Sequence, residues 1–289
     1  MPSISNDTIT IEVAEKGAEL QSLYNNKNGL QYMWEGDPAF WGKHSPVLFP
    51  IVGELKNKTY RYKGKAYQLS RHGFAREMDF KVSEQSATTL TLTIESNEHT
   101  LQLYPFPFAF SVAYALHENS IRITYQVINT GNEKMYFSVG GHPAFKIPLV
   151  QGITFEDYQL VFSEKESVGR WPISPDGLIE STPLHLLRNE DTLPLRKELF
   201  ANDAIVLKEL KSRSISISSA KSKHGLTVNF ENFPYLGIWE TKGGDFVCIE
   251  PWCGIADSVN ATGNLEEKEG INSLEPGGNF EASFTVELF

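Results

Sequence analysis

The chain has 289 residues, of which 40% are hydrophobic and 12% are aromatic, and it carries a formal net charge of −10 at pH 7. A chain of this length and composition can bury a large hydrophobic core, so we expect a folded globular protein. The negative charge argues against nucleic acid as a partner, because binding to a phosphate backbone requires clustered Lys and Arg side chains.

The amino-terminal segment 1–10 has neither the basic start nor the apolar centre of a secretion signal. No later stretch approaches the ~20 apolar residues that are needed to cross a bilayer. We therefore expect a cytoplasmic protein without a membrane partner.

Alternation of apolar and polar residues predicts β-strands along the whole chain, each with one buried and one wet face. The clearest runs cover 8–13, 90–94, 121–127, 215–218 and 284–288. Glycine-containing pairs between such runs predict chain reversals at Lys63-Gly64, Thr130-Gly131, Asp176-Gly177, Gly243-Gly244 and Gly277-Gly278. Helical periodicity is weak, and the best short candidates are 37–41 and 196–200.

The sequence has no linker, no low-complexity tract and no repeat of fixed period, which favours a single domain over residues 1–289. These features predict an all-β fold, a large antiparallel β-sandwich with few short helices. No glycine-rich phosphate-binding motif feeds a helix, so neither a dinucleotide fold nor a P-loop is supported. A functional site has to be built on sheets and loops.

The chain contains two cysteines, Cys248 and Cys253. Two cysteines are too few for a disulfide scaffold, and a lone C-x4-C pair lacks the second half of a structural zinc site. We interpret them as two reduced thiols near a strand end.

Two of the seven histidines lie among residues that restrict the backbone and leave room beside the imidazole. His72 is flanked by Arg71 and Arg76 in the segment RHGFAR, and His142 lies in the segment GGHPAF. A single histidine of this kind commonly has a structural role in a loop. Two in similar surroundings weaken the structural interpretation without removing it.

The segment CIEPWCG keeps one acid, Glu250, inside an otherwise apolar run. In an extended strand Cys248, Glu250 and Trp252 share one face, so the carboxylate has an indole beside it. Such a face suits a sugar, because the C–H patch of the ring packs on the aromatic surface while the hydroxyls meet polar groups. Burial would raise the pKa of Glu250 unless Arg71 or Arg76 offsets it. The alternative is a structural Glu–Arg pair.

Three motifs, in chain order, resemble the aldose 1-epimerase (galactose mutarotase-like) superfamily, in particular its LacX-like branch. They are RHGFAR around His72, GGHPAF around His142 and YLGIWETKGGDFVCIEPWCGIADS around Glu250. The segments SPVLFPIVGELKNKTYRYKGKAYQL and LFANDAIVL, the latter around Asp203, resemble the same branch. The resemblance therefore covers nearly the whole chain.

The resemblance implies a β-sandwich whose concave face binds a hexose and interconverts its α and β anomers, an isomerase activity without metal, nucleotide or other cofactor. By this analogy Glu250 is the base that takes the proton from the C1 hydroxyl. His142 donates a proton to the ring oxygen O5, and His72 supports O5 by hydrogen bonding. Elementary chemistry agrees, since opening a cyclic hemiacetal needs a base at O1 and an acid at O5.

The resemblance also points to residues that hold the sugar. Asp203 matches a position that binds sugar hydroxyls, although an Asp after Asn202 equally suits a turn. Trp239 and Trp252 are expected as apolar walls of the pocket, with ordinary core packing as the alternative.

The choice between a free and a phosphorylated hexose stays open. Glu54 and Lys56 stand where many relatives carry a sugar-binding arginine. An anionic Glu54 in the pocket would disfavour a phosphate, whereas Arg71 and Arg76 would favour one.

Three further readings remain beside a mutarotase for free hexoses. The same fold could act on hexose 6-phosphates, or bind a sugar without turning it over. Alternatively, His72, His142 and Glu250 could form a two-histidine, one-carboxylate metal site. The oligomeric state stays open between a monomer and a homodimer.

Overall fold

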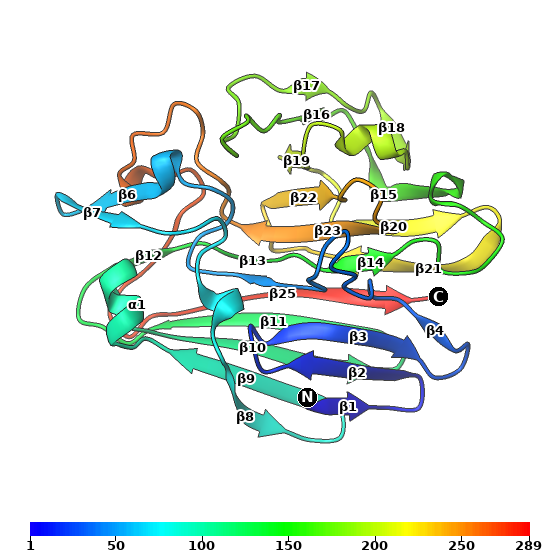
Figure 1. Cartoon of the computed structure of the whole chain (residues 1–289), viewed down its shortest axis with the longest axis horizontal. Coiled ribbons are helices and arrows are strands. Elements are labelled where there is room, and N and C mark those ends of the chain that lie inside the picture. The colour runs from blue at the N-terminus through cyan, green and yellow to red at the C-terminus, as the bar shows by residue number, and fades with distance from the viewer.

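A computed structural model describes all residues from 1 to 289 (Figure 1). The strands pair antiparallel and are joined by short turns and loops, as an all-β sandwich requires. The fold class predicted from alternation is therefore confirmed.

The largest layer is a twisted sheet of nine strands, and four of the five clearest predicted runs lie in it. Across the sheet the order is β18 (Glu190–Pro194), β15 (Tyr158–Glu166), β20 (Ser214–Ser219), β21 (Ser222–Asn229), β25 (Asn279–Leu288), β11 (Ser120–Asn129), β10 (Phe108–His117), β9 (Thr89–Glu95) and β8 (Lys81–Gln85).

Two smaller sheets form the opposing layer. The six-stranded sheet has the order β19 (Ile205–Lys208), β22 (Tyr235–Trp239), β23 (Phe246–Cys253), β13 (Val139–Gly141) and β5 (Val47–Leu48), with β14 (Ala144–Lys146) also paired to β23. The four-stranded sheet contains β1 (Ser3–Ser5), β2 (Ile9–Ala14), β3 (Glu19–Asn25) and β4 (Leu30–Gln31), and β2 corresponds to the predicted run at 8–13.

Three strand pairs lie outside these sheets: β6 (Thr59–Tyr62) with β7 (Lys65–Gln68), β12 (Met135–Phe137) with β24 (Asn272–Leu274), and β16 (Gly169–Arg170) with β17 (Leu184–His185). Lys63 and Gly64 form the two-residue loop between β6 and β7, and both have the positive φ that such a tight hairpin needs.

Helices are few and short. There is one α-helix, α1 (Glu98–Leu103). The 3-10 turns are η1 (Lys56–Lys58), η2 (Ala75–Glu77), η3 (Phe155–Asp157), η4 (Lys197–Phe200) and η5 (Leu265–Glu267). The helix expected at 196–200 is a 3-10 turn, whereas the one expected at 37–41 is wrong, since that segment forms only a turn. The helix α1 was not predicted, although Asn97 and Thr100 form a capping box at its start. None of the helices combines the length and apolar character that a membrane crossing requires.

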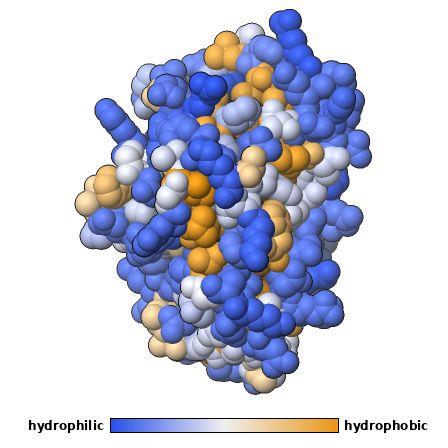
Figure 2. Space-filling model, turned by 90° about the vertical axis from the view of Figure 1, so that its right-hand side faces the viewer, coloured by the Kyte–Doolittle hydropathy of each residue, from blue (hydrophilic) through white to orange (hydrophobic).

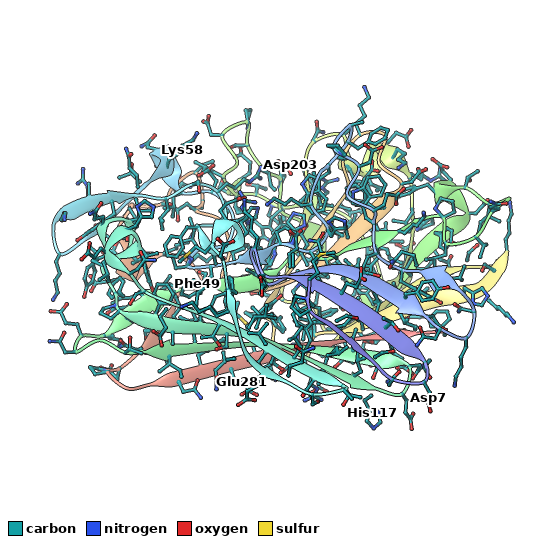
Figure 3. All side chains as sticks on the ribbon, turned by 60° about the horizontal axis from the view of Figure 1, so that its bottom comes forward. Asp7, Phe49, Lys58, His117, Asp203 and Glu281 are labelled. Carbon is teal, nitrogen blue, oxygen red and sulfur yellow. The ribbon has the colours of Figure 1, made fainter.

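The hydrophobic core lies between the two layers and contains 65 buried residues. In β10 and β11 every second residue is buried, so one face of the nine-stranded sheet forms one side of the core. Figure 3 shows Phe49 between the layers and Glu281 on the outer face of the nine-stranded sheet. On the face drawn in Figure 2 the surface is mostly hydrophilic, with narrow hydrophobic areas between polar side chains.

The central strand β23 is buried along its whole length and separates two environments. Val247 and Ile249 point into the main core. Cys248 and Trp252, on the opposite face, belong to two small separate clusters. This alternation puts Glu250 on the face of the six-stranded sheet that points away from the core.

Candidate active site

A pocket of about 260 Å³ opens on that face of the six-stranded sheet. Pockets for small molecules commonly span roughly 300–1,000 Å³, so this one is suited to a single small ring rather than a chain of rings. The pocket collects the eight residues that the sequence analysis expected to act on or hold the sugar, from five different parts of the chain: Arg71, His72, Arg76, His142, Asp203, Trp239, Glu250 and Trp252.

Glu250 lies in the middle of β23, opposite Gly237 of β22, and only 1% of the residue is exposed. Its Oε2 atom is buried and has no hydrogen-bond partner. Burial raises the pKa of Glu250 well above its ordinary value, and the nearby Asp203 carboxylate acts in the same direction while Arg71 opposes it. A carboxylate in these surroundings is a stronger base than one in water.

His142 follows directly after β13, and its Nε2 lies 3.4 Å from Oε2 of Glu250. The indole of Trp41 stacks on the imidazole with ring centroids 5.0 Å apart, and the Trp239 ring meets it edge-on at 5.4 Å. Burial lowers the pKa of His142 to about 3, and the charges of Arg76 and Arg71 act in the same direction. Because burial disfavours both charged forms, the lowered pKa of His142 and the raised pKa of Glu250 favour a neutral imidazole beside a neutral carboxyl group, with one acidic proton for the pair.

His72 has a left-handed backbone conformation, with φ of 68°, followed by Gly73 with φ of 73°. The Gly53 N–H donates a hydrogen bond of 3.1 Å to Nδ1 of His72. Burial lowers the pKa of His72 well below its ordinary value, so the ring is neutral. A neutral imidazole that accepts at Nδ1 carries its proton on Nε2. His72 is therefore fixed as a hydrogen-bond donor, with its ring centroid 5.8 Å from that of His142.

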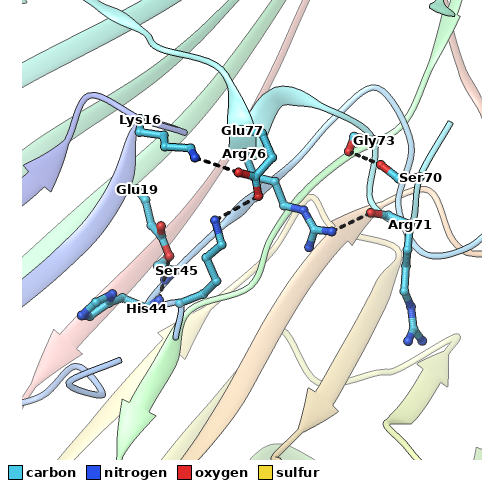
Figure 4. A network of polar contacts seen from close by, with 10 residues as sticks. Lys16, Glu19, His44, Ser45, Ser70, Arg71, Gly73, Arg76 and Glu77 are labelled. Carbon is cyan, nitrogen blue, oxygen red and sulfur yellow. Dashed lines mark hydrogen bonds and ion pairs between the residues drawn. The ribbon is translucent and has the colours of Figure 1, made fainter. Parts of the chain in front are cut away.

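Arg71 and Arg76 add positive charge to one side of the pocket. Nη2 of Arg71 lies 3.3 Å from Oδ2 of Asp203, and Nη2 of Arg76 donates a hydrogen bond to the backbone carbonyl of Arg71 (Figure 4). The Nε atoms of both arginines are buried without a partner. Asp203 is also a turn residue, because its φ is 71° and its Oδ1 accepts from the backbone N–H of Ala204. The turn role of Asp203 is therefore confirmed, and its contact with sugar hydroxyls stays a prediction.

Trp252 forms a flat wall because glycines lie beside it on both neighbouring strands. A Cβ atom at Gly237 would come within 2.4 Å of the indole, and one at Gly140 within 2.7 Å. Trp252 and Trp239 both line the pocket and also pack in the small clusters behind it. Each indole therefore both lines the pocket and packs against neighbouring apolar side chains.

Trp41 is a pocket residue that sequence reasoning missed. The Trp34 indole N–H donates to the Trp41 carbonyl, and the buried Glu19 carboxylate accepts from the backbone N–H groups of His44 and Ser45. Figure 4 shows the contact of Glu19 with the His44–Ser45 segment. These long-range bonds hold the 37–46 loop over the sheet, and no local sequence pattern signals them.

Glu54 and Lys56 do not line this pocket. Oε1 of Glu54 accepts from the backbone N–H of Leu55, and Nζ of Lys56 donates to the carbonyl of Val259. The charged side chains that line the pocket beside Glu250 are therefore Arg71, Arg76 and Asp203.

Comparison with known proteins gives consistent matches over the whole chain. The family model described as aldose 1-epimerase matches residues 2–287. The chromosomal protein LacX of Lactococcus lactis subsp. lactis is 37% identical over 296 residues, which cover 99% of this chain and 98% of LacX.

Two solved structures share the fold closely. A galactose mutarotase related enzyme from Lactobacillus acidophilus has a TM-score of 0.95 and 38% identity, covering 100% of this chain and 97% of that protein. A galactose mutarotase-like protein from Lactobacillus casei has a TM-score of 0.94 and 32% identity, covering 100% of both chains.

Proposed function

The chain belongs to the aldose 1-epimerase family, and on this premise we propose that it interconverts the α and β anomers of a hexose by opening and closing the sugar ring. The single observation that carries the proposal is the contact of Glu250 with His142 in a pocket of about 260 Å³. Such a pair can accept one proton and donate another within the width of one sugar ring.

In the proposed reaction Glu250 takes the proton from the C1 hydroxyl while His142 gives a proton to the ring oxygen O5. The C1–O5 bond breaks and the C1–O1 bond becomes a carbonyl. Rotation about C1–C2 presents the other face of the carbonyl, and the reverse proton transfers close the ring as the other anomer. The proton count of the pair is the same before and after, so the cycle balances without a further reactant.

Sugar binding has to change the protonation of the pair. Glu250 and His142 are in contact, and a hexose would lie between them and separate the two side chains. The C1 hydroxyl would donate to Glu250 and O5 would accept from His142. Both hydrogen bonds favour the carboxylate and imidazolium forms, so the bound sugar draws the shared proton onto His142.

His72 and the indoles complete the proposed site. The Nε2–H of His72 supplies a fixed neutral donor to O5 or an adjacent oxygen, since Gly53 holds Nδ1 as the acceptor. Trp252, Trp239 and Trp41 offer aromatic surface to the C–H patches of the ring. The pocket thus combines polar groups at the reacting atoms with apolar walls elsewhere.

A phosphorylated hexose is the second candidate substrate. The buried Nε atoms of Arg71 and Arg76 have no partner in the protein, and this favours a ligand that carries an anionic group. The contact between Arg71 and Asp203 already neutralises part of this charge, which supports the free hexose as the first candidate.

The test is an anomer-exchange assay on purified protein. Pure α-D-galactose, α-D-glucose and their 6-phosphates are followed by polarimetry and by NMR, with Glu250→Gln as the matched variant. We expect faster exchange with at least one sugar and loss of this acceleration in the variant. Tight sugar binding without any acceleration would instead identify a non-catalytic sugar-binding protein.

A further inference from the structure

One buried thiol lies beside the acid/base pair and has no role in the proposed reaction. Cys248 precedes Glu250 by two residues on the same face of β23, and it is fully buried. The ligand atoms of His142, Cys248 and Glu250 all lie within 4.8 Å of one another. We propose that these three side chains form a binding site for Zn²⁺, and that zinc bound there reversibly blocks the acid/base pair.

The distances already approach those of a zinc site. Bonds of about 2.0–2.1 Å to nitrogen and oxygen at a tetrahedral angle place the two ligand atoms about 3.3–3.4 Å apart. Nε2 of His142 and Oε2 of Glu250 are 3.4 Å apart. A sulfur bonded at about 2.3 Å would lie about 3.6 Å from either atom. Because 4.8 Å is the upper limit of these separations, a side-chain shift of at most about 1 Å would complete the geometry.

The ligand types also favour zinc. Thiolate, imidazole and carboxylate together bind Zn²⁺ or Co²⁺ well, whereas Mg²⁺ and Ca²⁺ prefer oxygen ligands. Oε2 of Glu250 is buried and unpartnered, so a cation would satisfy it. The fourth tetrahedral position would hold water.

The arrangement differs from the two-histidine metal site considered from the sequence. His72 does not belong to this group of ligand atoms. Cys248 provides the third ligand in its place.

Zinc binding would remove both groups that the proposed reaction needs. The metal would take the lone pair of His142 and the carboxylate of Glu250, so neither could transfer a proton. Binding would displace the proton shared by this pair and the thiol proton of Cys248. Zinc inhibition should therefore be competitive with the sugar and weaken as the pH falls. This inhibition rests on the proposed function, whereas metal binding itself does not.

The test uses the full chain stripped of metal with a chelator. Zn²⁺ is titrated in the anomer-exchange assay, and Co²⁺ is titrated separately while the thiolate-to-cobalt absorption band is recorded. We expect inhibition that a chelator reverses, and a cobalt spectrum of a tetrahedral site with one thiolate. The sugar should weaken both effects.

The matched variants are Cys248→Ala and Cys253→Ala. Cys253 is the other free thiol, on the core face of the same strand, where Sγ donates to the carbonyl of Asn232. Cys248→Ala should keep the rate without zinc, lose the cobalt band, and need at least about tenfold more zinc for half inhibition. Cys253→Ala should behave like the unchanged protein. If Cys248→Ala does not fold, Cys248→Ser keeps the side-chain size and serves the same purpose.

Each outcome separates the metal site from the enzyme proposal. A cobalt band that is absent, or that survives in the Cys248 variant, overturns the site. A thiolate–cobalt band in a protein that accelerates no anomer exchange supports the site and refutes the proposed function instead.

Discussion

Replacement of His142 by Asn tests the protonation state that the pocket imposes. Burial lowers the pKa of His142 from its ordinary value of 6.5 to about 3, so the folded protein keeps this ring neutral while the unfolded chain protonates it below pH 6.5. A depressed histidine pKa removes stability as the pH falls. At pH 5 the loss amounts to about 2 kcal/mol, and at pH 7.5 it is close to zero.

Asn cannot be protonated, so His142→Asn escapes this loss. The difference in Tm, variant minus unchanged protein, should therefore rise by about 3 °C between pH 7.5 and pH 5, because about 2.1 cal/mol/K per residue over 289 residues gives roughly 1.6 °C per kcal/mol. Comparing two pH values cancels any packing change that the substitution causes. Differential scanning calorimetry in sugar-free buffer with a chelator gives both values.

His117 provides the control, because it lies exposed at the end of β10 (Figure 3). His117→Asn should show no comparable pH-dependent difference. A neutral His142 in the folded protein is refuted if the Tm difference for His142→Asn decreases toward pH 5. That result would mean that the folded protein holds His142 as an imidazolium paired with a Glu250 carboxylate.

Substitutions of the other pocket residues should have effects of different size on rate and stability. Glu250→Gln should slow anomer exchange by about 10²–10⁴-fold in the NMR assay while sugar affinity persists, and near-normal turnover would rule out this residue as the base. Above about pH 4.5 the same variant should melt at a higher temperature than the unchanged protein, because the raised pKa of Glu250 makes its charged form costly to bury. This gain in Tm should vanish in calorimetry at lower pH, where the carboxyl is protonated in both the folded and the unfolded chain. His72→Asn should lower the rate less than Glu250→Gln, because His72 only donates a hydrogen bond, and an equal loss in the same assay would assign it a proton-transfer role. Gly237→Ala should cost about 1–3 kcal/mol in calorimetry and weaken sugar binding in titration calorimetry, because the new methyl group displaces Trp252, whereas Gly42→Ala meets only ordinary contacts and should do neither.

The strands were predictable because their signal is local. Alternation with a period of two follows from strand geometry, and the runs at 121–127 and 284–288 lie within strands that alternate between buried and less buried residues. The helix expected at 37–41 failed for the complementary reason. Five residues are too few to stabilise a helix by themselves, and bonds from Trp34 and Glu19 fix this loop instead.

The pocket shows the same division between local and distant information. The motifs around His72, His142 and Glu250 singled out side chains that line one pocket. Trp41, which stacks on His142, was missed because it comes from a loop whose position depends on residues far away in the chain.

The sequence by itself determined the all-β class, the family, and the face of β23 that carries Cys248, Glu250 and Trp252, because covalent geometry fixes which residues of a strand share a face. Only the tertiary structure decided that Glu250 meets His142 at 3.4 Å, that Gly53 sets the proton position on His72, and that Cys248 lies within reach of both members of the pair. These contacts join strands and loops distant in the chain. Their geometry comes from the packing of two layers and the loops above them, which no local pattern encodes.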